Sequence, residues 1–339
     1  MHIFFQIWRK FIKLKFVTIL LLSAAIISFG TFSIHLLEPE TFPTLFEGLW
    51  WTMTTLTTVG YGDYSPKTTG GRLVGMFLFL FGIGIIGLLI SRFVDLISTY
   101  NRLKTEGKLM YKRKNHYIYI TYSKKTKDAI EEVLAAEPLA EIVLIDTFPS
   151  VPYEHDQLFY VQGDPSEEAT LLKANILHAK RVCIFSDSSI DDSTLADGKT
   201  LLIATAVESL SHTYEQNIHT IVEISKESHI GKFKHVNVDD FILSNDSVSR
   251  LMARATLHPG TTNIFRQLLS KKYGSNIHEI KPMPEWKTIR DAYLSLFEQG
   301  AVLISINEDM NFLADKEHPL QPDDMLFIVC NDEALSKFS

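Results

Sequence analysis

The seven residues from Thr57 to Asp63 read Thr-Thr-Val-Gly-Tyr-Gly-Asp, and they constrain the fold more than any other stretch. Glycine at Gly60 and Gly62 permits backbone angles that other residues resist, so that successive carbonyl groups can point the same way. The preceding segment, 43–57, contains two adjacent tryptophans and a single charged residue. We expect this segment to be a short apolar helix that re-enters a membrane. Non-helical backbone at that depth is tolerated only when it is buried in protein or lines a wet cavity.

Two uncharged stretches flank this segment, with 22 residues between Lys15 and Glu38 and 19 between Arg72 and Arg92. A 22-residue helix is about 33 Å long, against a hydrocarbon core of about 30 Å. The first stretch exceeds a normal signal-peptide core, and a second one follows it, so we expect two membrane spans. The expected membrane domain is therefore 1–98, with spans at about 16–37 and 73–94, a re-entrant helix at 43–57, which is the pore helix of the resemblance described below, and the glycine-containing loop at 58–62.

The composition divides the chain into two parts. The 339 residues are 46% hydrophobic and 22% charged, with a net charge of −7, which excludes a disordered, collagen-like or disulfide-rich chain. Residues 1–98 carry seven basic and five acidic side chains, whereas the rest carry 26 basic and 35 acidic. Charge density therefore doubles near residue 98, where a membrane part gives way to an acidic, water-facing part.

The charges that flank the spans predict the orientation. The loop between the spans carries more acid than base. Basic residues precede the first span and follow the second. By the positive-inside rule, both termini are cytoplasmic and the protein crosses the plasma membrane twice. The basic residues are Arg9, Lys10, Lys13 and Lys15 before the first span, and Arg102, Lys104, Lys108, Lys112, Arg113 and Lys114 after the second.

The stretch from Thr58 to Asp63 resembles the signature T-V-G-Y-G-D of potassium channels. In that family, backbone carbonyls replace the hydration shell of the permeant K+ ion. One chain supplies one quarter of each oxygen cage, so the resemblance implies a homotetramer. It implies that the selectivity filter is formed by Thr58, Val59, Gly60, Tyr61 and Gly62.

The resemblance also implies residues that support the filter. Trp50 and Trp51 occupy the place of an aromatic cuff that braces Tyr61, with ordinary interfacial tryptophan as the alternative. Asp63 aligns with the acid at the outer mouth. Thr54 stands where some relatives have a glutamate that pairs with that acid, so this carboxyl pair is absent here.

Three residues of the second span align with gating positions of the family. Gly82 stands where related channels have a hinge glycine, although close helix packing at small residues is the alternative. Ser91 and Asp95 align with two acidic positions at the cytoplasmic pore mouth of relatives with large conductance. The chain has no arginine-repeat span, so we expect no voltage sensor.

A basic segment at 99–115 follows the second span. We expect it to be a solvated linker at the membrane face, with contact to anionic membrane lipid as an alternative. Met110 could be an internal start that releases free cytoplasmic domains, as in some relatives.

From residue 116 onward, apolar strand-like runs alternate with helical stretches, which predicts a parallel, doubly wound sheet. This part resembles the RCK domain, with a TrkA-N lobe and a small TrkA-C lobe, as in calcium- or nucleotide-gated RCK channels. We expect the N-lobe at 116–245, a dimerisation helix-turn-helix at 246–273 and the C-lobe at 274–339. The expected fold class is an α-helical two-transmembrane pore domain with a re-entrant pore helix, then an α/β Rossmann-like RCK domain and a small α+β C-lobe. The expected strands are Tyr117–Thr121, Glu141–Ile145, Leu158–Val161, Arg181–Phe185, His219–Ile224, Phe241–Leu243, Ala301–Ile306 and Met325–Cys330.

The turn after the first strand bears on nucleotide binding. A dinucleotide-binding turn needs glycines there, so that the backbone can approach the pyrophosphate. Residues 121–126 contain none. Lys124 and Lys125 could meet phosphates, but solvated lysines explain them as well, and Asp146 stands where a ribose-binding acid belongs. The weak nucleotide-binding candidates are Ser123, Lys124, Lys125, Asp146 and Asp164.

Calcium-gated relatives use acids after the fourth strand and on the fifth. The corresponding candidates here are Asp187, Asp191 and Glu223, with Ser225 in place of a second acid on the fifth strand. Calcium prefers six to eight oxygens, and a solvated acidic loop is the alternative. The regulatory ligand stays open among Ca2+, NAD(H), an adenine nucleotide and a cyclic dinucleotide.

The sequence therefore favours a potassium-selective channel gated by ligand binding to a cytoplasmic ring of RCK dimers. A membrane-anchored NAD-dependent oxidoreductase would need the missing glycine-rich turn and would leave the filter motif unexplained, so we expect no enzyme. A regulatory subunit that assembles with another channel is a third interpretation. We expect no nucleic-acid partner, because no basic groove with interleaved aromatics is visible.

Overall fold

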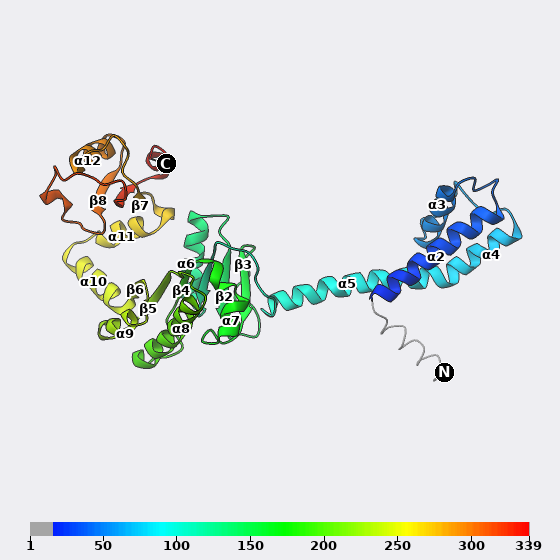
Figure 1. Cartoon of the computed structure of the whole chain (residues 1–339), viewed down its shortest axis with the longest axis horizontal. Helices are drawn as coiled ribbons and strands as arrows, with labels where there is room; N and C mark the ends of the chain where they lie inside the picture. The colour runs from blue at the N-terminus through cyan, green and yellow to red at the C-terminus, as the bar shows by residue number, and fades with distance from the viewer. Residues whose placement is uncertain (1–15, 339) are drawn as a thin grey trace. The chain divides into compact units, whose positions relative to one another are not determined.

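The computed structural model describes residues 16–338, which form two compact units (Figure 1). The first unit ends at Leu103 and the second begins at Lys104. The basic residues predicted to precede the first span, Arg9, Lys10, Lys13 and Lys15, lie outside the described residues.

The first unit is built from helices around a small apolar core. Two helical stretches, Phe16–Leu37 and Thr69–Thr105, are long and apolar enough to cross a membrane. Its elements are α2 (Phe16–Leu37), α3 (Leu45–Leu56), α4 (Thr69–Phe77), a π-helical turn η1 (Leu78–Gly82) and α5 (Ile83–Thr105). The core residues are Ile34, Phe42, Trp51, Leu56, Val74 and Leu78.

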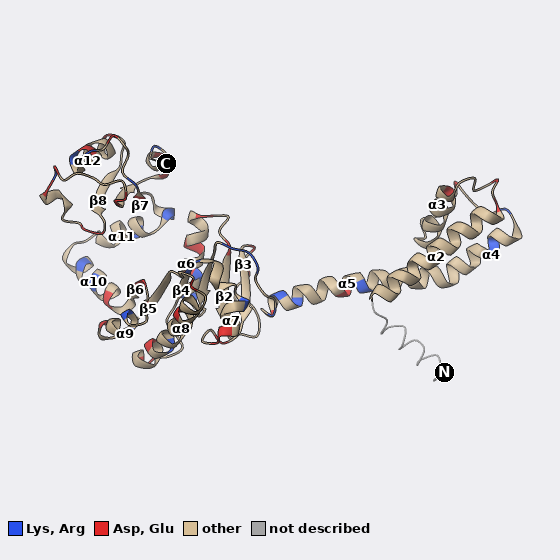
Figure 2. Ribbon diagram, in the orientation of Figure 1, with Lys and Arg blue, Asp and Glu red and all other residues tan. Residues whose placement is uncertain are grey.

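The second helical stretch is longer than predicted. It extends beyond both ends of the expected span at 73–94, and α5 continues seven residues into the expected linker, to Thr105. Neither glycine nor proline occurs between Gly87 and Gly107, which has a φ of +62°. A glycine with positive φ just after the last turn is a common way to end a helix. The last turns of α5 are basic (Figure 2).

The second unit begins with a six-stranded parallel sheet in the order β3-β2-β1-β4-β5-β6. This is the doubly wound order, with the reversal between β1 and β4. The strands are β1 (His116–Ile120), β2 (Ile142–Asp146), β3 (Leu158–Gln162), β4 (Ala179–Ile184), β5 (Thr220–Ile224) and β6 (Asp240–Leu243). The helical elements are α6 (Lys124–Ala136), α7 (Glu168–Lys173), η2 (Ile176–His178), α8 (Ser193–Thr213), η3 (Glu227–His229) and α9 (Ile230–Lys234).

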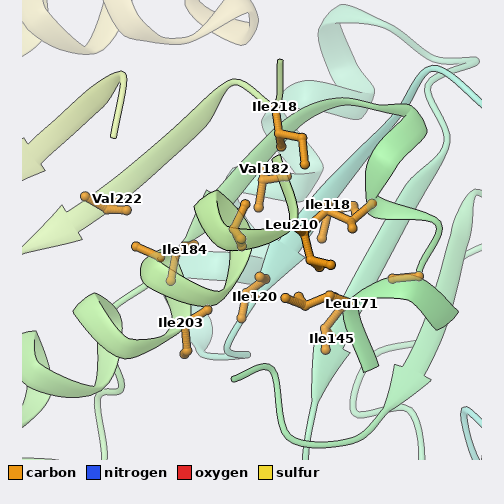
Figure 3. Close-up of a cluster of buried hydrophobic side chains, with 14 of the residues drawn as sticks. Ile118, Ile120, Ile145, Leu171, Val182, Ile184, Ile203, Leu210, Ile218 and Val222 are labelled. Carbon is orange, nitrogen blue, oxygen red and sulfur yellow. The ribbon is translucent and has the colours of Figure 1, made fainter. Parts of the chain in front are cut away.

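Alternate strand residues build two apolar cores, one on each face of this sheet. On one face, Ile118 and Ile120 of β1 pack with Leu171 of α7 and with Ile203 and Leu210 of α8 (Figure 3). On the other face, residues of α6 cover the tyrosines of β1. Each fully buried aliphatic side chain contributes about 1.5–3 kcal/mol. The sheet is thus a rigid frame for the loops at its carboxyl edge.

The chain then forms a helix pair and a small second lobe. The C-lobe is a three-stranded antiparallel sheet in the order β7-β9-β8, covered by α12. The elements are α10 (Ser244–Leu257), α11 (Thr261–Leu269), η4 (Lys271–Tyr273), β7 (Asn276–Ile280), α12 (Ile289–Glu298), β8 (Val302–Ile306), η5 (Phe312–Ala314), β9 (Leu326–Cys330) and α13 (Asp332–Leu335).

The predicted fold class is confirmed, and the predicted strands lie within two residues of the observed ones. The strand β7 was not predicted, because Asn-Ile-His-Glu-Ile has few apolar residues and owes its place to pairing with β9. Within the expected solvated linker, residues 112–115 are exposed, whereas residues 105–111 are bound to the second unit. Backbone hydrogen bonds tie this segment to β3 and to residues near α7.

Candidate functional site

The filter loop, Thr58–Gly62, follows the carboxyl end of α3. The Thr44 amide donates to Glu47 Oε2 at 3.0 Å and so closes the first turn of α3. At the other end, the carbonyl of Thr54 accepts the amides of Val59 at 3.0 Å and of Gly60 at 3.1 Å. The last turn of α3 therefore fixes where the loop begins.

The backbone of the filter loop alternates in handedness. Thr58, Gly60 and Gly62 have φ values of +61°, +56° and +78°, respectively, and the residues between them do not have positive φ. This alternation lets neighbouring carbonyls point in a common direction, as a carbonyl-lined pore requires. A Cβ at Gly60 or Gly62 would meet no atom within 4 Å in this chain. One side of the loop is thus uncovered in a single copy.

Trp50, Tyr61 and Asp63 meet beside the filter loop. The Trp50 and Tyr61 rings stack with centroids 5.7 Å apart and an interplanar angle of 3°. The Trp50 Nε1 donates to Asp63 Oδ2 at 2.8 Å. Trp51 instead packs against Phe42 in the helical core, with centroids 5.5 Å apart. Of the two predicted cuff residues, Trp50 thus contacts the filter within the chain and Trp51 anchors α3.

A buried carboxylate, Glu38, joins the carboxyl end of α2 to the residues that precede α4. It accepts the amides of Lys67 at 2.9 Å and of Thr68 at 2.8 Å, and the Thr68 hydroxyl at 2.6 Å. Burial raises the pKa of Glu38, but these hydrogen bonds lower it more, so that the net pKa lies below its usual value. Sequence reasoning missed this residue, because its partners are about 30 residues away and carry no motif.

The predicted gating residues lie along the second helical stretch. Gly82 ends the π-helical turn, and a Cβ there would lie 1.9 Å from Leu56 Cδ2. Close packing against α3 thus requires a glycine, and π-turns are frequent at functional sites. Ser91 and Asp95 lie on α5, where Asp95 is 3.5 Å from Arg92 Nη1. Their side chains are exposed in the single chain.

Polar groups of the turn after β1 hydrogen-bond to one another and to Asp146. The amide of Tyr122 donates to Asp146 Oδ2 at 2.6 Å. Ser123 caps α6, since its Oγ accepts from the amide of Thr126 at 3.3 Å, while its own amide donates to Thr126 Oγ1 at 3.1 Å. Asp146, the candidate ribose-binding acid, thus accepts the amide of Tyr122, while the amides of Ser123 and Thr126 are used in the cap of α6.

An ion pair joins the first turn of α6 to β5. Lys125 Nζ contacts Glu223 Oε1, and Glu223 Oε2 accepts the amide of Ser186 at 3.0 Å. The Glu223 side chain is 9% exposed and that of Lys125 is 51% exposed. The structure therefore brings together one nucleotide candidate and one calcium candidate as partners. We call the residues Tyr122–Thr126, Asp146, Ser186 and Glu223 the sheet edge.

The other acidic candidates have partners of their own. Asp187 accepts Lys199 Nζ at 2.6 Å and Ser189 Oγ at 2.6 Å. Burial raises the pKa of Asp187, but these hydrogen bonds lower it to about 2. Asp164 accepts the amide and hydroxyl of Ser166. Two further candidates are exposed: Asp191, and Lys124, which is 3.2 Å from Asp128.

These contacts bear on whether the candidate residues could bind calcium or a dinucleotide. Across residues 16–338, no group of three His, Cys, Asp or Glu side chains could hold a metal ion. Asp187, Asp191 and Glu223 are thus not gathered into a group of this kind. At the sheet edge, Asp146 already accepts the Tyr122 amide, and Ser123 and Thr126 bond to each other, so a dinucleotide would have to displace these bonds.

Comparisons with known proteins agree with this architecture. Residues 16–99 match the ion-channel family, and residues 140–228 match the RCK domain of slowpoke-like calcium-activated potassium channels. The chain is 32% identical over 268 residues to the calcium-gated potassium channel TvoK of Thermoplasma volcanium, which covers 77% of this chain and 74% of TvoK. It is 29% identical over 245 residues to the putative potassium channel protein YugO of Bacillus subtilis, with 72% of each covered.

A solved structure supports the fold. The GsuK channel matches with a TM-score of 0.50 at 15% identity, over 94% of this chain. The chain spans 57% of the length of that channel's chain.

Together, the two apolar helices, the predicted filter loop between them and the doubly wound sheet define an ion channel with a regulatory domain. This chain belongs to the family of potassium channels that carry an RCK domain. It is a membrane protein of an ion-channel family, which is not a class of enzymes.

Proposed function

We propose that four copies of this chain form a potassium-selective pore, with Thr58, Val59, Gly60, Tyr61 and Gly62 as the filter. The alternating handedness at Thr58, Gly60 and Gly62 carries this proposal. The exposure of Val59 and Tyr61, at 53% and 68%, supports it, because such apolar and aromatic side chains need cover from other copies. Trp50, Trp51 and Asp63 support the filter from α3 and from the outer mouth.

The pore unit is proposed to span the plasma membrane with both termini in the cytoplasm. Glu38 and Asp63 would then face the outside, and the basic end of α5 would face the inside. The proposed division is a pore domain at 1–98, a linker at 99–115, an N-lobe at 116–245, a helix-turn-helix at 246–273 and a C-lobe at 274–339. Lipid contacts the apolar surfaces of α2 and α5, whose large side chains are mostly exposed in one chain.

RCK domains of different copies pair through the helices α10 and α11. These helices have no buried residue in the single chain. Apolar faces of this extent are covered in soluble proteins, and a second RCK domain provides the cover. Pairs of RCK domains then form a gating ring, to which free subunits started at Met110 can contribute. The exposed apolar residues are Val248, Met252, Leu257, Ile264, Phe265 and Leu269.

Ligand binding to this ring opens or closes the pore by favouring one ring geometry over the other. Gly82 serves as the hinge of the inner helix, and Ser91 and Asp95 lie at the inner mouth. The classes to be tested are Ca2+, NAD(H), an adenine nucleotide and a cyclic dinucleotide. A ligand at the sheet edge has to displace Lys125 from Glu223, or release Tyr122 from Asp146, before it can bind.

Two measurements on the whole chain test the proposal. Potassium efflux from proteoliposomes should exceed sodium efflux by at least about tenfold, and the loss of this preference would refute the filter assignment. A thermal-shift series with the four ligand classes should raise the unfolding temperature with one class, since a ligand of the folded state stabilises it. If none stabilises the protein, control by these ligands is refuted and the potassium pore stands.

A further inference from the structure

The end of the inner helix continues into a strap of the RCK domain, residues 105–111, that follows the edge strand β3. The amide of Val151 donates to the Thr105 carbonyl at 2.8 Å, and the amide of Gln162 donates to the Gly107 carbonyl at 3.0 Å. Further along, the amide of Tyr111 donates to the Lys173 carbonyl at 2.9 Å. The strap is therefore bound to β3, α7 and the β2–β3 loop at both of its ends.

Lys173, the last residue of α7, holds the middle of the strap. Its Nζ donates to the Gly107 carbonyl at 2.7 Å and to the Gln162 carbonyl at 3.3 Å. Burial lowers the pKa of Lys173, with a smaller contribution from Lys108. The ammonium group thus connects α7, β3 and the strap at one point.

The strap can take this path only because residue 107 is glycine. Gly107 has a φ of +62°, and a Cβ there would lie 2.5 Å from the Gln162 nitrogen and 2.7 Å from Tyr160 Cδ1. Any other side chain would push the strap off β3. Tyr111 anchors the far end, because its ring is buried and packs 4.5 Å from the ring of His116.

We propose that Lys173 is the positioning residue that couples the RCK domain to the inner helix. The inference rests on the proposed function, in which the RCK domain controls the pore. We call the hydrogen bond from Lys173 Nζ to the Gly107 carbonyl the clamp. The first compact unit ends at Leu103, four residues before Gly107, so only a short piece of chain separates the clamp from α5. A shift of α7 carries the Gly107 carbonyl with it and pulls on the end of that helix. A free subunit started at Met110 lacks Gly107 and therefore lacks the clamp.

The test uses the full chain in proteoliposomes and in detergent. Lys173→Met removes the ammonium group but keeps most of the apolar stem, and Lys173→Arg keeps the charge and the donors. Gly107→Ala breaks the same contact from the side of the strap. Lys180→Met is the matched control, since Lys180 pairs with Glu137 and Tyr117 away from the strap. Amide hydrogen exchange of residues 105–111 and of Gln162 reports docking, and potassium efflux reports coupling.

We expect Lys173→Met and Gly107→Ala to speed exchange of the strap at least tenfold and to change potassium efflux at least threefold. Lys173→Arg and Lys180→Met should both show the exchange and the potassium efflux of the wild type. All variants should keep the preference for potassium over sodium. Unchanged exchange in both Lys173→Met and Gly107→Ala overturns the clamp. Faster exchange with unchanged efflux overturns the coupling. Wild-type efflux without preference for potassium refutes the proposed pore instead, whatever the exchange result.

Discussion

The filter loop and the sheet edge are both built where regular structure ends, yet they differ in how complete one chain leaves them. At the filter loop, Gly60 and Gly62 face empty space and Tyr61 is largely exposed. At the sheet edge, Lys125 and Glu223 are already partners within one chain. The filter loop needs other copies to cover its exposed side, whereas the ion pair of the sheet edge must break before a ligand can bind there. A family resemblance therefore carries over more safely to the filter than to the ligand site.

The largest effect is expected when the alternation of the filter loop is broken. Gly60→Ala places a Cβ on a residue with a φ of +56°, and left-handed backbone costs a non-glycine residue about 1–2 kcal/mol in each chain. We expect the Gly60 carbonyl to turn away and potassium efflux from proteoliposomes to fall at least about 100-fold.

The control for this substitution is Gly84→Ala. Gly84 lies in α5, and a Cβ there would meet no atom within 4 Å. Alanine also favours a helix over glycine by roughly 1 kcal/mol, so efflux should stay close to wild type. Normal, potassium-selective efflux through the Gly60→Ala channel would show that the alternation is not the basis of the filter.

A smaller effect is expected at Glu38, the carboxylate that supports the pore unit from within the same chain. Glu38→Gln replaces a charged acceptor of three hydrogen bonds by an amide, and hydrogen bonds to charged groups contribute about 1.5–3 kcal/mol. We expect a loss of about 2–3 kcal/mol, seen as a lower unfolding temperature of the solubilised channel, with potassium selectivity retained.

The pH dependence of Glu38 follows from the direction of its pKa shift. A carboxyl whose pKa is lower in the folded state stabilises the fold above its unfolded value of 4.5. This contribution is lost as the pH falls through the folded pKa. Glu38→Gln should therefore flatten the loss of stability below about pH 4.5. Glu40→Gln, at an exposed neighbour, serves as control, and equal acid sensitivity of both variants would contradict the role of Glu38.

The elements that were predictable from the sequence are those with a local signal. Apolar runs specify the spans and the strands, and the filter loop carries its own geometry in the spacing of Gly60 and Gly62. The contacts that support these elements were not predictable, because they join distant residues. Lys125 and Glu223 are 98 residues apart, and Lys173 reaches back 66 residues to Gly107. The binding of residues 105–111 was not predictable for the same reason, since their composition gives no sign of the amide and ammonium groups that donate to the carbonyls of Thr105 and Gly107.

The smallest effect, and the sharpest test of the comparison, concerns the sheet edge. Lys125→Met removes the partner of a carboxylate that is 9% exposed, while Lys125 itself is half exposed. A partly buried pair of this kind is worth more than a surface pair of about 0–1 kcal/mol, and less than a fully buried pair. We expect Lys125→Met and Glu223→Gln each to cost about 1 kcal/mol, with the double variant coupled by roughly 0.5–1.5 kcal/mol in a double-mutant cycle. Lys124→Met is the control, because the ion pair of Lys124 is with Asp128, an exposed acid on the same helix. If the sheet edge is closed by this pair, Lys125→Met should also gain a stabilising response to Ca2+ that wild type shows more weakly, because the Glu223 carboxylate is then unpaired. Additive single effects together with an unchanged ligand response would mean that the pair does not close the sheet edge. The contrast between an incomplete filter loop and a closed sheet edge would then be wrong for the sheet edge.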